Sequence, residues 1–228
     1  MKNQDTILIT GANRGIGLEL VKESLVTGLN VIGTYRNIKN SKELIQIQSE
    51  KLKIFEMNVI DEKSILEVSK NIKKPIDYLI CNAGINNGFG TIFEDDHSHE
   101  KMLEVLNINV LGCVLTIKNF IKNLNNNAKI ILISSVMGMQ AHSGSSATIY
   151  RASKAAVNNI MVSISEDLKS DKITVTSFHP GWVRTNMGGP NATLSAKESA
   201  ESLIKSFLNL KFENTGKFFN YDGSLMSF

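Results

Sequence analysis

Short apolar segments alternate with longer helical patterns along almost the whole chain, and six of the seven strand candidates are followed by a helical pattern. Repeated strand–helix units predict a parallel sheet with helices on both faces, joined by right-handed crossovers. We therefore expect an α/β chain with a doubly wound, seven-stranded and mostly parallel sheet. The strand candidates are "TILIT" (6–10), "NVIGTY" (30–35), "LKIFEM" (52–57), "IDYLIC" (76–81), "AKIILIS" (128–134), "KITVTSF" (172–178) and "GKFFNY" (216–221), and the helical patterns lie near 15–27, 41–49, 61–71, 100–123, 151–169 and 195–209.

Composition restricts the classes of protein that remain. The chain has 228 residues and three prolines, and no Pro-rich or Ser-rich linker divides it, so we expect a single domain over 1–228. The net charge is only +3 and the basic residues are scattered, which argues against a nucleic-acid partner. No run of about 18 apolar residues suggests a membrane span. Cys81 and Cys113 lie in apolar segments without metal or redox spacing, and no charged leader precedes the strand at Ile7, which together predict a cytoplasmic protein with reduced cysteines.

A glycine-rich segment, "TGANRGIG" (10–17), follows the first strand and opens the first helix. Gly11 allows a tight turn, Gly15 lets the backbone approach a pyrophosphate, and Gly17 permits close packing of helix on strand. The start of the helix adds unpaired N–H groups and the positive end of its dipole. This arrangement predicts a dinucleotide site, and the alternative is an ordinary glycine-rich turn between strand and helix.

The second strand candidate indicates which dinucleotide is bound. A cofactor with a free ribose 2′-hydroxyl is usually held by an acidic residue about 20 residues beyond the glycines. Here no acid occurs before Glu43, whereas Arg36 follows the strand and Arg14 lies in the glycine segment. Two guanidinium groups and no carboxylate suit a 2′-phosphate, which predicts NADP(H) rather than NAD(H). The alternative is that both arginines are simply solvated.

Tyr150 and Lys154 are four residues apart in "SSATIYRASKAAV" (145–157). On a helix this spacing places a phenol and an ammonium group on one face. A neighbouring lysine favours phenolate and lowers the pKa of the tyrosine, which suits a proton donor for a carbonyl oxygen. Such a pair alone also arises by chance.

Six motifs occur in one order along the chain: "TGANRGIG" (10–17), "CNAG" (81–84), "NINVLG" (107–112), "SSVMG" (134–138), "YRASK" (150–154) and "HPGWVRTNMGG" (179–189). In this set the chain resembles the short-chain dehydrogenase/reductase family over essentially its whole length. The last two motifs and the short carboxyl end look most like the branch of the sniffer-type carbonyl reductases and the bacterial C-factor proteins. The resemblance implies a Rossmann-type domain with a cofactor half at about 1–135 and a catalytic and substrate-binding part at about 136–228.

The resemblance implies catalytic roles for four residues. Tyr150 would be the acid/base, and Lys154 would lower its pKa while binding the nicotinamide ribose. Ser135 would hydrogen-bond the substrate oxygen, and Asn109, where the family helix is bent, would hold a water that relays protons to Lys154. Ser134 is the rival for the serine role, although a strand residue at that position is expected to point the other way.

The resemblance also implies a cofactor site built mostly from loop residues. Asn82, Ala83 and Gly84 would line the cofactor, and Thr185 would contact the carboxamide. Asn58 stands where the family usually has an aspartate near the adenine, and an amide still accepts a hydrogen bond. The full set expected to hold NADP(H) is Gly11, Asn13, Arg14, Gly15, Ile16, Gly17, Arg36, Asn58, Val59, Asn82, Ala83, Gly84, Tyr150, Lys154, Pro180, Gly181, Val183 and Thr185.

These patterns lead us to expect an NADPH-dependent enzyme that reduces the carbonyl group of a small aldehyde, ketone or quinone. A nucleotide-binding regulator of the C-factor type is the alternative from another class, and an alcohol or hydroxysteroid dehydrogenase is the alternative among enzymes. The helices near 101–121 and 151–169 are apolar on more than one face, which favours a homodimer or a tetramer. The small, glycine-rich segment 186–196 is expected to be a mobile lid. We expect no metal: His97 and His99 lie near three acids in "DDHSHE" (95–100) without a further ligand motif.

Overall fold

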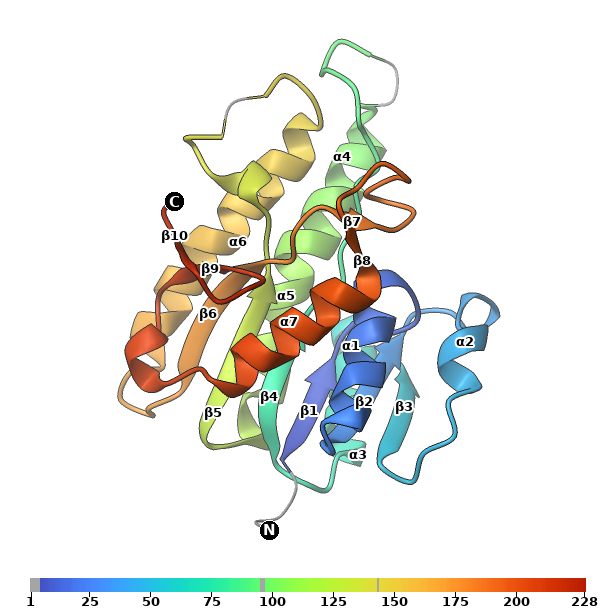
Figure 1. Ribbon diagram of the computed structural model, residues 1–228, viewed down its shortest axis with the longest axis vertical. Helices are drawn as coiled ribbons and strands as arrows, with labels where there is room; N and C mark the ends of the chain where they lie inside the picture. Colours follow the sequence, from blue (N-terminus) through green and yellow to red (C-terminus); the bar gives the residue numbers. More distant parts are fainter. Residues whose placement is uncertain (1–4, 95–96, 143) are drawn as a thin grey trace.

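The computed structural model describes residues 5–94, 97–142 and 144–228 (Figure 1). Its main sheet has the strand order β10-β9-β6-β5-β4-β1-β2-β3. All neighbouring strands are parallel except β10, which is antiparallel to β9. The strands are β1 (Thr6–Ile9), β2 (Asn30–Tyr35), β3 (Leu52–Glu56), β4 (Ile76–Cys81), β5 (Leu124–Ile133), β6 (Thr174–His179), β9 (Phe218–Asn220) and β10 (Leu225–Met226). The predicted doubly wound α/β fold is confirmed.

The strand count differs from the predicted seven. The sheet has an eighth strand, β10, and a separate two-stranded parallel sheet pairs β7 (Val183–Arg184) with β8 (Leu194–Ser195). Each of these three strands is two residues long. So short a strand has no period-two pattern to detect, and tertiary contacts alone define it.

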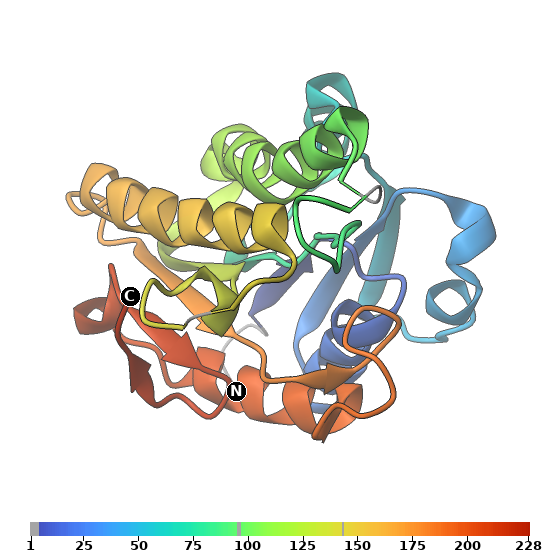
Figure 2. The ribbon, with the colours of Figure 1, turned by 90° about the horizontal axis from the view of Figure 1, so that it is seen from above.

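Helices cover both faces of the sheet, as the view from above shows (Figure 2). One face carries α3 (Glu62–Asn71), α4 (His99–Leu106), α5 (Gly112–Phe120) and α6 (Thr148–Asp167), and the other carries α1 (Gly15–Val26) and α7 (Ala196–Leu208). The short helix α2 (Lys42–Ile45) lies beside β3 (Figure 1). It is four residues long rather than the predicted 41–49, because the polar stretch that follows it, "QIQSEK" (46–51), lacks an apolar face to bury.

Alternating side chains of the central strands divide the core into two clusters. On β1, Ile7 and Ile9 belong to the cluster under α1 and α7, whereas Leu8 belongs to the cluster under the other helices. Both clusters are fully buried around β1, with Ile7, Leu8 and Ile9 at most 1% exposed. A strand buried on both faces is continuously apolar, which is why "TILI" shows no alternation in its sequence.

The strand order reverses beside β1, whose neighbours are β2 on one side and β4 on the other. The helix after β1 covers one face and the helix after β4 covers the opposite face (Figure 2). Ligands of doubly wound sheets bind in the crevice that this reversal opens at the carboxyl ends of the strands. Four of the six motifs follow β1, β4, β5 and β6 directly and therefore meet at this edge, whereas "NINVLG" lies in the helical run 99–123 and "YRASK" lies on α6.

One helical segment is long and apolar enough to cross a membrane, although the sequence has no uninterrupted run of about 18 apolar residues. The continuous helical run His99–Asn123 has an 18-residue window with a mean hydropathy of 1.3, of which 44% is buried inside the structure. The apolar core helix of a globular domain has the same length and composition, so this is weak evidence for a span. Its α5 part packs against α3, and its α4 part packs against α6.

Candidate active site

The glycine segment after β1 is shaped by contacts that exclude side chains. A Cβ added at Gly17 would lie 2.3 Å from the carbonyl oxygen of Gly11, and one added at Gly11 would lie 2.9 Å from Cα of Ala83. Gly11 also has a positive φ of 64°, a conformation that L side chains rarely adopt. The glycines therefore allow α1 to start directly against the ends of β1 and β4.

A hydrogen-bonded junction fixes the glycine segment to the end of β4. Asn82 donates from Nδ2 to the carbonyl oxygens of Thr10 (2.8 Å) and Gly11 (3.2 Å). In return, the Thr10 hydroxyl accepts hydrogen bonds from the backbone N–H groups of Asn82 (3.0 Å) and Ala83 (3.1 Å). Thr10 was not assigned a role from the sequence. Its only signal was its place as the first residue of the glycine motif.

The start of α1 suits an anionic ligand. Arg14 is the N-cap residue in an extended conformation, and no described side chain caps the first turn of this helix. The first N–H groups of a helix need partners, and phosphate oxygens are good ones. Asn13 ties the segment to the turn after β2 by donating from Nδ2 to the carbonyl oxygen of Asn40 (2.9 Å). The glycine cradle and the uncapped helix start therefore fit the pyrophosphate of a dinucleotide.

The two arginines expected at a 2′-phosphate are exposed at this end of the crevice. Arg36 follows β2 directly, and its Nη1 lies 4.0 Å from Oε1 of Glu104 on α4. Its side chain is 63% exposed, so this ion pair is weak and leaves the guanidinium available to another anion. Arg14 is exposed as well.

Asn58, expected near the adenine, and Val59, expected to bind the cofactor, differ in how accessible they are. Asn58 follows β3, and its Oδ1 accepts a hydrogen bond from the backbone N–H of Ile60 (3.3 Å). Val59 is buried in the core, and its side chain lies against Gly112. The side chain of Val59 is therefore part of the core.

Tyr150 lies on the first turn of α6 and faces the end of β5. Burial raises the pKa of its hydroxyl group to about 12, and a hydrogen bond with Ser135 opposes this rise. Ser135 is the N-cap of the short helix η4 (Val136–Gly138), with its Oγ 3.1 Å from the backbone N–H of Met137. Ser134 points elsewhere, because its hydroxyl donates to the carbonyl oxygen of Lys154 (3.3 Å). The structure therefore brings Ser135, and not Ser134, to the tyrosine.

Lys154 is buried beside this pair. Its Nζ donates to the backbone carbonyl oxygen of Ile133 (2.8 Å) and lies 5.6 Å from the centroid of the Tyr150 ring. Burial lowers the pKa of the ammonium group. This lysine is not among the causes that shift the pKa of Tyr150: burial raises that pKa, and the hydrogen bond with Ser135 lowers it. A Cβ at Gly84 would lie in ordinary van der Waals contact with Nζ (3.6 Å) and closer to Oδ1 of Asn109 (3.2 Å), so the ammonium group lies beside the "CNAG" turn.

Asn109 lies in the π turn η2 (Asn107–Leu111) between α4 and α5, where the sequence predicted a bend. Its Oδ1 accepts from the N–H of Ile85 (2.8 Å), and its Nδ2 donates to the carbonyl oxygen of Ile85 (2.9 Å) and to Oγ of Ser153 (3.0 Å). The side chain is fully buried. It therefore fastens the loop after β4 to α6 through Ser153, a residue that the sequence did not single out. Both hydrogens of Nδ2 are used in these contacts, so a relay water would bind at an oxygen atom.

The segment after β6 faces the glycine segment across the crevice. A Cβ added at Gly15 would lie 3.3 Å from Cγ2 of Thr185. Val183 is buried, Gly181 has a positive φ of 86°, and the carbonyl oxygen of Pro180 accepts from the hydroxyl of Ser199 on α7 (2.6 Å). These contacts place the expected nicotinamide residues opposite the expected pyrophosphate residues.

Further side chains beside Tyr150 were not assigned a role from the sequence, apart from His97, which belongs to the motif considered for a metal. They surround a small cavity of about 10 Å³ lined by Asn86, Asn87, Gly88, His97, Lys101, Met102, Val105, Ile149 and Tyr150. Among the described residues, no group of three His, Cys, Asp or Glu side chains could hold a metal ion. Asp95 and Asp96, which belong to the motif considered for a metal, lie outside the described residues.

A family model described as "short chain dehydrogenase" matches residues 5–194. The chain belongs to the short-chain dehydrogenase family. This confirms the resemblance inferred from the six motifs.

Individual relatives agree with the branch suggested by the sequence. The C-signal of Myxococcus xanthus is 35% identical over 153 residues, which cover 66% of this chain and 91% of that protein. The structure is similar to the carbonyl reductase Sniffer of Drosophila melanogaster, with a TM-score of 0.93, 29% identity and coverage of 99% and 100% of the two chains. It is also similar to an NADPH-bound carbonyl reductase from chicken fatty liver, with a TM-score of 0.91, 30% identity and the same coverage.

Proposed function

We propose that this oxidoreductase reduces the carbonyl group of a small aldehyde, ketone or quinone with NADPH. The observation that carries the proposal is the hydrogen-bonded pair of Tyr150 and Ser135 at the carboxyl edge of the sheet, with the Lys154 ammonium group fixed behind it. Two hydroxyl donors that converge on one point suit an oxygen that gains negative charge. When bound, NADPH supplies the hydride.

The chain's own groups then hold the substrate and move a proton. Ser135 and Tyr150 both donate hydrogen bonds to the carbonyl oxygen, and Tyr150 passes its phenolic proton to that oxygen as negative charge develops there. Lys154 stays hydrogen-bonded to Ile133, so its charge remains close to the tyrosine throughout. Because burial raises the pKa of Tyr150 to about 12, the phenol carries its proton at neutral pH.

The preference for NADPH rests on the adenosine end of the crevice. Arg36 and Arg14 are exposed there, and a guanidinium group binds a phosphate through paired N–H donors. Both arginines fit the role expected of residues that bind a 2′-phosphate. The NADPH bound to the chicken carbonyl reductase supports the same cofactor. The remaining cofactor contacts that we propose are the glycine segment, the "CNAG" turn and residues 180–185.

A second candidate function follows from the relationship to the C-signal protein, whose name indicates signalling. In this role the chain would bind NADP(H) and report on it without turnover. The test is NADPH and NADH consumption against a panel of aldehydes, quinones, diketones and ketosteroids. Turnover with NADPH supports the reductase, and tight NADPH binding without turnover on any substrate supports the regulator.

We also propose that the protein is a cytoplasmic homodimer. Large apolar side chains are exposed on α4 (Leu103, 43%), on the π turn η2 (Leu111, 51%) and on α6 (Val162, 39%). Apolar side chains on the outer surface of neighbouring helices favour burial against a second copy. Sedimentation at micromolar concentration tests this, and a monomer there contradicts it.

A further inference from the structure

The segment between β6 and α7, residues 182–195, forms a closed strap. Its first and last residues pair as the small parallel sheet of β7 and β8, with Val183 opposite Leu194 and Arg184 opposite Ser195. The backbone N–H of Leu194 also donates to the carbonyl oxygen of Trp182 (3.0 Å). The sequence predicted a mobile lid at 186–196, and in the structure the two ends of the segment that contains it are joined.

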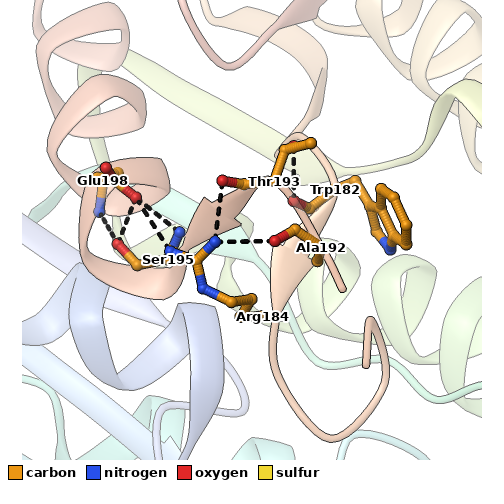
Figure 3. A network of polar contacts seen from close by, with 6 residues as sticks. All are labelled: Trp182, Arg184, Ala192, Thr193, Ser195 and Glu198. Carbon is orange, nitrogen blue, oxygen red and sulfur yellow. Dashed lines mark hydrogen bonds and ion pairs between the residues drawn. The ribbon is translucent and has the colours of Figure 1, made fainter. Parts of the chain in front are cut away.

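Two side chains join these ends: the Thr193 hydroxyl donates to the carbonyl oxygen of Trp182 (3.3 Å), and Arg184 makes the larger set of contacts (Figure 3). Its Nη1 donates to the carbonyl oxygens of Ala192 (2.8 Å) and Thr193 (2.9 Å), and its Nη2 lies 3.6 Å from Oε2 of Glu198. One guanidinium group thus connects the start of the strap, the end of the strap and the first turn of α7. A planar fork of donors makes this possible, and a lysine ammonium does not have that geometry.

Glu198 is itself held in place at the start of α7. Its Oε2 accepts from both the N–H and the hydroxyl of Ser195 (2.7 Å each), and its own N–H donates to Oγ of Ser195 (3.1 Å). This reciprocal capping box anchors the carboxylate where the helix dipole also favours it. Arg184 therefore reaches from the strap to a fixed point on the fold.

The tip of the strap folds back on its own base. Nε1 of Trp182 donates to the carbonyl oxygen of Gly188 (2.8 Å), and the N–H of Gly189 donates to the carbonyl oxygen of Thr185 (2.9 Å). A Cβ at Gly188 would lie 2.0 Å from the carbonyl oxygen of Val183. The tip and the ends are therefore held by separate sets of contacts, and only the ends depend on Arg184.

The strap lies against the glycine segment. A Cβ added at Gly15, at the start of α1 where the structure suits a pyrophosphate, would lie 3.3 Å from the methyl group of Thr185. A dinucleotide that runs from this helix start to Tyr150 has to pass between the glycine segment and the strap. Opening this passage requires the strap to move away from α1.

We propose that Arg184 is a positioning residue that keeps the strap closed over the bound nucleotide, so that breaking its fork sets the rate of nucleotide release. The proposal rests on the proposed function, because the ligand concerned is NADP(H). It assigns Arg184 no contact with the substrate or the cofactor. The expected consequence is a faster exchange of nucleotide with little change in the chemistry at Tyr150.

The test compares Arg184→Met, which keeps the alkyl stem, with Arg184→Lys and with Lys197→Met. Lys197 serves as the control because it is a cation in the same turn of α7 as Glu198, but it pairs with Glu201 along the helix (3.7 Å) and has no hydrogen bond or ion pair with the described residues of the strap. The rate of amide hydrogen exchange in the peptide 183–195, measured in the protein without ligand, reports how often the strap opens. We expect about tenfold faster exchange in Arg184→Met, an intermediate value in Arg184→Lys and no change in Lys197→Met.

The second measurement is the rate of NADPH release, which is followed by NADPH fluorescence after the complex is mixed with excess NADP⁺. We expect about tenfold faster release in Arg184→Met. If hydrogen exchange in 183–195 is unchanged in Arg184→Met, Arg184 does not keep the strap closed. If exchange is faster but NADPH release is unchanged, closure of the strap does not set the release rate. Absence of NADPH binding in the wild type contradicts the proposed function instead, and the exchange experiment still decides whether Arg184 closes the strap. If Arg184→Met does not fold, Glu198→Gln is used in its place in both measurements, because it removes the negative charge that Arg184 contacts.

Discussion

His179 provides a quantitative test of the site's electrostatics. It ends β6, directly before Pro180, and its Nδ1 is buried with no hydrogen-bond partner among the described residues. Burial lowers the pKa of the imidazole from 6.5 to about 4, and the nearby His142 adds to this effect. The folded protein therefore keeps His179 neutral at pH values where the unfolded chain binds a proton.

The sign and size of the effect follow from these two values. Because the folded pKa lies below the unfolded one, the stability contribution is complete above pH 6.5 and is lost as the pH falls towards 4. Each unit of difference is worth about 1.4 kcal/mol. The loss in the free energy of unfolding is therefore about 2 kcal/mol at pH 5 and approaches about 3 kcal/mol below pH 4.

The assay is urea unfolding between pH 8 and pH 4 of the wild type and of His179→Gln, which has no titrating ring. Other acids titrate equally in both proteins, so the difference between the two free energies isolates His179. We expect this difference to change by about 2 kcal/mol between pH 7 and pH 5 in the direction that disfavours the wild type. A difference that stays constant across this range would refute the assignment of a buried neutral imidazole.

Two further substitutions test separate parts of the site. Asn109→Leu leaves both backbone groups of Ile85 without their partner, so we expect a loss of about 3 kcal/mol in the free energy of unfolding by urea. Asn119→Leu on the same helical run, where the side chain is only partly buried, is the control and should cost less than about 1 kcal/mol; equal losses would contradict the bridging role of Asn109. Arg36→Met should weaken NADPH binding about tenfold or more in fluorescence titration and leave NADH binding unchanged. An equal loss for both nucleotides would show that Arg36 does not recognise the 2′-phosphate.

Much of the fold could be predicted from the sequence because neighbouring residues determine these strands and helices. The apolar segments at 6–10, 30–35 and 76–81 became β1, β2 and β4 with bounds that differ by at most one residue. The glycine segment could be assigned from its neighbours, since a strand before it and a helix after it leave few other conformations. The spacing of Tyr150 and Lys154 likewise placed both residues on α6.

The structural features that could not be predicted from the sequence depend on contacts between segments that are distant along the chain. β7 and β8 exist only because Val183 meets Leu194, and nothing in either dipeptide predicts a strand. The ammonium group of Lys154 was expected to act on Tyr150 first, but it lies against the carbonyl oxygen of Ile133, which belongs to another element. The fork of Arg184 in the strap has the same origin, because its acceptors become neighbours only when the segment folds back.

The central claim is that Tyr150 donates the proton in an NADPH-dependent reduction, and the most direct test is NADPH oxidation by the wild type and by Tyr150→Phe with the best substrate of the carbonyl panel. We predict that the variant loses about 10²-fold to 10⁴-fold in turnover while binding NADPH as tightly as the wild type. Near-normal turnover in Tyr150→Phe would contradict the account.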